Sequence, residues 1–202
     1  MNFMAKQCLE LRINIMSRQF IIVTSLLIFY FQFSGISSAQ SYRDLGPVSL
    51  NETFRNLLKF SKYNEFENLE KSLQLIKPLS QTLDSKYSNK SGKAIQNSIE
   101  KKDGEKAVQG IQQLIFLDIK DQLLIGIDTV PNSKEQALSK FKNAYMDYLL
   151  LSPFIQENNY SGDQKIKNLF RKLLLLINKS DQLPAVYQDI EKEIMNSFPN
   201  LK

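Results

Sequence analysis

The stretch LIFLDIKDQLLIGID, Leu114 to Asp128, decides the fold class, because it is a long apolar run that carries aspartates at helical spacing. At about 100° per residue, Asp118 falls at the centre of one apolar face, and Asp121 and Asp128 lie on its flank. The apolar members of that face are Ala107, Ile111, Leu114, Ile115 and Ile125. We therefore predict a helix over about 105–128 that turns a carboxylate toward the core.

A carboxylate on a core-facing stripe needs a partner, because burying an isolated charge is very costly. Asp118 must therefore be paired, hydrogen-bonded, bound to a metal or protonated. The candidate partners are the hydroxyls of Tyr145 and Tyr148 on the next predicted helix and the guanidinium of Arg171 on the helix after that. We expect a structural polar network here, with Asp121 as a further candidate member. A ligand groove and a metal site are the alternatives.

Two capping boxes mark helix starts elsewhere in the chain. Ser49 with Glu52, and Ser133 with Gln136, have the spacing at which the first side chain caps the helix and the second reaches back. Apolar residues at helical spacing follow each box. Those predicted to face inward are Leu50, Phe54, Leu57 and Leu58 after the first box, and Leu138, Phe141, Tyr145, Tyr148 and Leu149 after the second.

Three prolines delimit further helices. Pro78 is expected to bend or split a helix over 64–87, Pro153 to end or kink the helix that follows Ser133, and Pro184 to open the last helix. Another helix is predicted over 161–180. The inward residues of these last two helices are Ile166, Phe170, Leu173, Ile177, Val186, Ile190 and Ile194. With no convincing strand signal, we predict an all-α bundle of about five to seven helices.

The N-terminus has the pattern of an export signal. Arg18 precedes an apolar run over 20–31, and the small residues Ser37 and Ala39 offer a cleavage site after Ala39. The run is shorter than the about 20 apolar residues that a membrane span needs. We therefore predict that 1–39 is a cleaved signal peptide, with an uncleaved anchor as the alternative, and that the protein is periplasmic or otherwise extracytoplasmic.

The predicted mature chain, 40–202, is interpreted as a single helical domain. Met16 directly precedes the basic start of the signal segment and is a second candidate start of the chain. Cys8 is the only cysteine, so the mature chain has no disulfide framework. Removing 1–39 takes away three bases and one acid and lowers the formal charge from +5 to about +3. Because this net charge is small and the basic residues are scattered among acidic ones, we expect no nucleic-acid partner.

The residue types that are missing exclude several chemistries. The chain has no histidine and the mature part has no thiol, which removes the usual zinc sites, haem attachment, histidine proton transfer and cysteine nucleophiles. No glycine-rich phosphate loop is present. Oxygen ligands remain, which suit hard ions such as Ca²⁺ or Mg²⁺. The sequence indicates no cofactor.

The stretch KNAYMDYLLLSPFIQENNYSGDQKIKNLFRKL, residues 142–173, resembles the extracytoplasmic helical region of bacterial high-affinity iron permeases. The shared pattern is an Ala-Tyr pair, an aromatic residue three positions on, an Asp and a downstream Phe. Its members here are Ala144, Tyr145, Tyr148, Asp163 and Phe170. The chain lacks their membrane core and the Arg-Glu-x-x-Glu motif that iron translocation would need. The resemblance therefore implies a detached helical domain, an accessory that meets a membrane partner or a metal.

These observations favour an exported, non-enzymatic helical accessory or interaction module, associated with a membrane complex or metal uptake. Its expected partner is a protein, which could itself be membrane-bound. The alternative is a carboxylate-based enzyme or a hard-metal-binding protein that uses a site around Asp118. Paired carboxylates about 5 to 9 Å apart in a pocket would favour that alternative.

Overall fold

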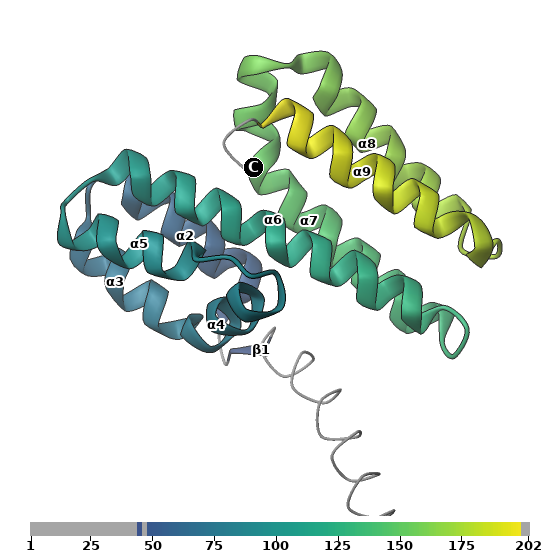
Figure 1. Cartoon of the computed structure of the whole chain (residues 1–202), viewed down its shortest axis with the longest axis horizontal. Helices are drawn as coiled ribbons and strands as arrows, with labels where there is room; N and C mark the ends of the chain where they lie inside the picture. Colours follow the sequence, from purple (N-terminus) through teal and green to yellow (C-terminus); the bar gives the residue numbers. More distant parts are fainter. Residues whose placement is uncertain (1–43, 46–47, 199–202) are drawn as a thin grey trace, which may run out of the picture. The chain divides into compact units, whose positions relative to one another are not determined.

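The computed structural model describes residues 44–45 and 48–198, which belong to one compact unit, Asp44–Lys202. The predicted signal segment 1–39, with Cys8 and Met16, lies outside the described residues. The described residues form eight α-helices, which confirms the all-α bundle (Figure 1). The helices are α2 (Leu50–Lys62), α3 (Phe66–Leu75), α4 (Lys77–Lys86), α5 (Ser91–Glu100), α6 (Gly104–Thr129), α7 (Lys134–Asn158), α8 (Tyr160–Leu175) and α9 (Leu183–Ser197).

Short elements flank the helices. The strands β1 (Asp44–Leu45) and β2 (Val48–Ser49) pair antiparallel, with Leu45 opposite Val48, just before α2. The sequence pattern did not predict this pair, because two residues are too few for an alternation to be recognised. A 3-10 turn, η1 (Ser180–Gln182), precedes α9.

Polar side chains cap four of the helices, and the caps predicted at Ser49 and Ser133 are confirmed. Ser49 accepts from the backbone N–H of Glu52 over 3.2 Å, and Ser133 caps α7 in the same way, over 3.3 Å. Asp103 caps α6 and Asn159 caps α8, each through an N–H three residues ahead. Each cap satisfies a backbone donor that the first helical turn leaves free, which fixes where these helices begin.

The two internal prolines have different effects. Pro78 lies in the first turn of α4, and the chain breaks between α3 and α4 at Ile76, so the predicted split is confirmed. This split raises the helix count to eight, one above the predicted range. Pro153 lies inside α7, so of the two predicted outcomes, an end or a kink of this helix, the end is wrong. The carbonyl that loses its donor belongs to Leu149, which is partly exposed to water.

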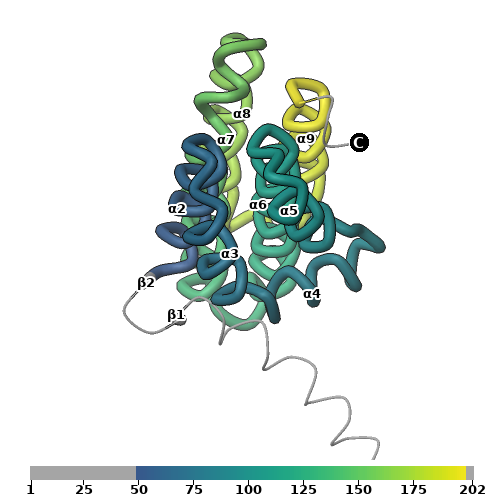
Figure 2. Tube along the Cα trace, turned by 90° about the vertical axis from the view of Figure 1, so that its left-hand side faces the viewer, coloured from purple at the N-terminus to yellow at the C-terminus, as the bar shows by residue number. Residues whose placement is uncertain are grey.

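Helix α6 lies at the centre of the packing. It contacts α5, α7 and α2, and also α4 and α9, and Figure 2 shows α5 lying against it. More than half of its 26 residues are therefore buried, on more than one face. The predicted inward residues Ala107, Ile111, Leu114 and Ile115 are fully buried, whereas Ile125 is half-buried.

The inward face of α7 differs from the predicted stripe. Leu138 and Leu149 are 37% and 36% exposed, so their predicted burial is wrong. The buried face instead follows Ala137, Phe141, Ala144, Tyr148, Leu151 and Ile155. The reason is that α7 packs against both α6 and α8, which places its small alanines on the inward side.

Among the described helices, none has the length and apolar character needed to cross a membrane.

Candidate functional site

Asp118 is fully buried in the middle of α6, which confirms its predicted placement. Gln122, one turn further on and also buried, places its side-chain nitrogen 3.5 Å from Oδ1 of Asp118. The side-chain oxygen of Gln122 is buried without a hydrogen-bond partner. Asp118 therefore lies in a polar part of the core.

The hydroxyl of Tyr148 lies in a different network from the one predicted. It donates to Oδ1 of Asp163 over 2.5 Å, and Ser152 donates to the same oxygen over 2.7 Å. Gln156 and Lys167 donate to Oδ2 over 2.9 and 2.8 Å. Asp163 is fully buried in the first turn of α8, and three of its donors come from α7. The network therefore links these two helices, and the expectation that Tyr148 serves Asp118 is corrected.

Electrostatics keep this network in one protonation state near neutral pH. Burial acts to raise the pKa of Asp163, but the hydrogen bonds from Lys167, Ser152, Tyr148 and Gln156 outweigh it and lower that pKa to about 2. Burial and the adjacent Asp163 carboxylate raise the pKa of Tyr148. The pair is therefore an ionised acceptor and a neutral donor, which suits a structural role better than proton transfer.

The remaining residues of the permease-like pattern gather at the same place. The half-buried ring of Tyr145 lies 5.3 Å from that of Phe170 and 6.3 Å from that of Tyr148, measured between centroids. The rings of Tyr148 and Phe170 lie 5.4 Å apart. Ala144 is fully buried nearby on α7. These contacts form an aromatic layer between α7 and α8 next to Asp163.

Arg171 is exposed, so its predicted role as a core partner of Asp118 is wrong. Its guanidinium donates to the side-chain oxygen of Asn168 over 2.9 Å on the solvent side of α8. The helix periodicity explains this position, because Arg171 follows the buried Phe170 by one residue and turns about 100° away from it.

Asp121, which was predicted on the flank of the apolar face, is buried and joins α4 to α6. It accepts from Lys86 over 2.5 Å and from the hydroxyl of Tyr87 over 3.0 Å. Lys120 lies over the Tyr87 ring, 5.1 Å from its centroid, and pairs with Glu191 of α9 over 2.6 Å. Burial and the Asp121 charge raise the pKa of Tyr87. This cluster bridges three helices. Tyr87 and Asp121 are 34 residues apart in the sequence and Lys120 and Glu191 are 71 apart, so no local sequence pattern could have predicted these pairs.

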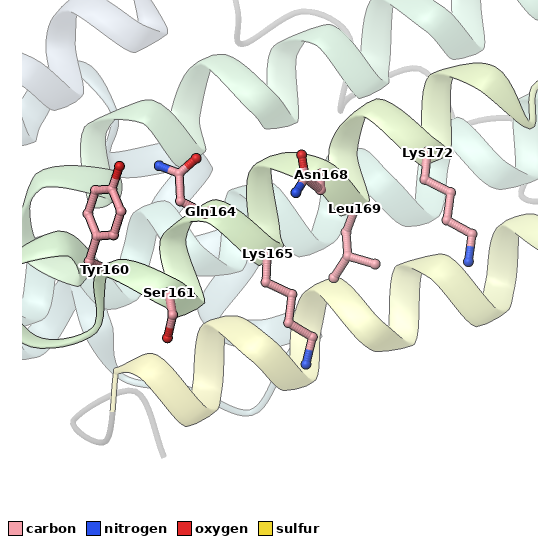
Figure 3. A pocket seen from close by; sticks show the side chains of 7 residues that line it. All are labelled: Tyr160, Ser161, Gln164, Lys165, Asn168, Leu169 and Lys172. Atoms are coloured by element: carbon pink, nitrogen blue, oxygen red, sulfur yellow. The ribbon is translucent and has the colours of Figure 1, made fainter.

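Of four open hollows on the surface of the described domain, two are clearly larger than the other two. The first, about 570 Å³, follows the outward side of α8 and has no carboxylate in its lining (Figure 3). The second, about 540 Å³, lies where α2, α6 and α7 meet, and its lining includes the exposed Glu105 and Glu157. Asp118 lines neither hollow. Glutamates in open water lack the apolar setting that tunes a carboxyl group for acid catalysis.

Within residues 44–45 and 48–198, no group of three or more acidic, histidine or cysteine side chains is placed to hold a metal ion. Comparison with protein-family models, with curated proteins and with solved structures gives no match.

Proposed function

We propose that this chain is an exported, non-enzymatic helical interaction module that acts as an accessory to a protein partner. The observation that carries the proposal is the placement of exposed apolar side chains. Among the described residues, six of the eight large apolar side chains that are exposed lie on α7 and α8. They are Leu138, Met146, Leu149, Tyr160, Leu174 and Leu175. Apolar side chains concentrated on two adjacent helices are typical of a contact surface.

The polar groups of the domain support the same proposal. Asp163 is surrounded by donors, and Asp121 is held by Lys86 and Tyr87. Side chains that are engaged in this way stabilise helix packing and are not free to meet a substrate. The N-terminal signal pattern, with Arg18 before an apolar run, supports export.

Site-specific photo-crosslinking tests the proposal. A photoreactive residue replaces Met146, which is 40% exposed on α7, and the full chain is produced in the cells that make it naturally. We expect an adduct with one defined protein. The matched control replaces Leu75, which is 52% exposed on α3. Equal labelling from both positions, or no protein adduct from Met146, would contradict the proposed function.

A further inference from the structure

The outward side of α8 is basic. The helix carries four cations and one acid, and the acid, Asp163, is fully buried. The cations are Lys165, Lys167, Arg171 and Lys172. The exposed surface that α8 itself contributes is therefore positive without an interspersed carboxylate.

Two of these cations are neutralised and two are not. Lys167 pairs with Asp163 over 2.8 Å, and Lys165 pairs with Glu193 of α9 over 2.7 Å. In the part of the chain that the structure describes, Arg171 and Lys172 have no carboxylate within ion-pair distance, and the guanidinium of Arg171 donates a hydrogen bond to the neutral Asn168. Arg171 and Lys172 are thus available to an external anion.

Exposed apolar side chains lie at both ends of the same helix. Tyr160 at its start is 65% exposed, and Leu174 and Leu175 at its end are 41% and 82% exposed. Leu175 lies three residues after Lys172, so both belong to one helix face. The hollow of Figure 3 lies between the two apolar ends, and Lys165 and Lys172 extend from the same side of α8 there.

We propose that this outward face of α8 docks on an anionic phospholipid surface. Arg171 and Lys172 would contact the lipid phosphates, while Leu174, Leu175 and Tyr160 enter the headgroup boundary. Lysine and arginine beside leucine and an aromatic residue are the composition of helices that lie in a membrane interface. The inference rests on the proposed function, because export would place the chain beside such a surface.

The degree of exposure favours a lipid surface over a protein for this face, which leaves Leu138, Met146 and Leu149 of α7 as the protein contact surface of the proposed function. A leucine that is 82% exposed protrudes, and a protein partner would need a pocket shaped to receive it. A bilayer interface accepts a protruding apolar side chain without a preformed pocket. Long cationic side chains beside it extend to the lipid phosphates. The positive charge of the face complements anionic headgroups and not neutral ones.

Vesicle co-sedimentation of the processed protein tests the inference. We expect binding to vesicles of phosphatidylglycerol and phosphatidylcholine, little binding to phosphatidylcholine alone, and weaker binding at high salt. Replacing Arg171 and Lys172 by Gln should weaken binding about fivefold for each cation, and Leu175→Gln about tenfold. The controls Lys93→Gln and Leu75→Gln alter an exposed lysine on α5 and an exposed leucine on α3, and should bind like the unaltered protein.

Three results would overturn the inference: no sedimentation with anionic vesicles, equal sedimentation with neutral ones, or equal losses in the controls. Every variant keeps the same N-terminal residues, so any contribution of these residues to vesicle binding is equal in all samples. A protein adduct from Met146 without vesicle binding would leave the proposed function standing and remove the lipid surface. Vesicle binding without a protein adduct would do the reverse.

Discussion

The hydroxyl of Tyr148 donates to Oδ1 of Asp163 over 2.5 Å, and both side chains are fully buried where α7 meets α8. An ionised carboxylate in such a place is tolerated only when donors surround it. Ser152, Gln156 and Lys167 supply the others. Because the donors come from both helices, the network around Asp163 fixes how α8 docks on α7.

Tyr148→Phe should lower the free energy of unfolding by about 1 to 3 kcal/mol, because Asp163 then loses a buried donor while the ring packing is kept. Urea denaturation followed by circular dichroism measures the change. Tyr145→Phe is the matched control, since Tyr145 is only half-buried and shares the same aromatic layer. Its cost should stay within about 0.5 kcal/mol. Equal costs for the two variants would contradict a specific role for the Tyr148 hydroxyl.

The stability of the domain should fall in acid partly through Asp163. Its folded pKa, about 2, is depressed below the ordinary value of 3.8, so ionisation favours the folded state. This contribution is fully present above about pH 4 and disappears as the pH falls toward 2; it amounts to about 2 kcal/mol. In Asp163→Asn the loss of stability between pH 4 and 2 should be smaller by this amount. An unchanged acid slope in this variant would show that the carboxylate is not stabilised as described.

Asp118→Asn should cost about 1 to 3 kcal/mol of unfolding free energy, because the carboxylate is fully buried in a polar part of the core. Asp128→Asn changes the same chemistry at the exposed end of the same stretch and should stay within about 0.5 kcal/mol. Parallel urea titrations compare the two. If Asp128→Asn were as costly as Asp118→Asn, burial would not explain the effect.

Local patterns in the sequence predict the helices well. The Ser49 and Ser133 caps, the split at Pro78 and the burial of Asp118 depend on residues a few positions apart, whose geometry the helix itself determines. The partners of the buried polar groups depend on how separate helices dock. Tyr148 finds Asp163 rather than Asp118 because α8, not the middle of α6, lies beside its hydroxyl.

Weak amphipathicity explains the errors on α7. This helix packs against α6 and α8 at once, so its buried positions spread over a wide arc and no single stripe separates Leu138 from Phe141. The sequence places Arg171 off the centre of the apolar stripe of its helix, and in the structure this offset is large enough to expose its side chain to solvent. The sequence identifies Asp121 as a candidate but not its cluster, because Lys86, Tyr87 and Glu191 come from other parts of the chain.

The mature protein should begin near Gln40, because small residues at Ser37 and Ala39 follow the apolar run. N-terminal sequencing of the protein from fractionated cells checks this, and we expect recovery outside the cytoplasm. Ala39→Leu, which removes the small residue at the predicted cleavage position, should leave a longer, unprocessed chain. A cytoplasmic protein that retains Met1 or Met16 would refute the export prediction.

Gly126 allows α6 and α7 to approach closely. A Cβ atom built on it would lie 2.4 Å from Cε1 and 2.7 Å from Cδ1 of Phe141, a ring that is itself only 1% exposed and cannot move away cheaply. Alanine has a higher helix propensity than glycine, by up to about 1 kcal/mol. Overpacking a closed core, however, typically costs about 1 to 3 kcal/mol. We therefore expect Gly126→Ala to destabilise the domain by about 1 to 2 kcal/mol in urea denaturation.

The double variant Gly126→Ala with Phe141→Leu separates overpacking from other causes of this loss. Leucine removes the ring atoms that the new methyl group would meet, so the double variant should be more stable than the sum of the two single changes implies. A favourable coupling of about 1 kcal/mol or more would support the close approach. If the two changes were simply additive, or if Gly126→Ala alone were stabilising through helix propensity, α6 and α7 would be farther apart at Gly126 than the structure places them.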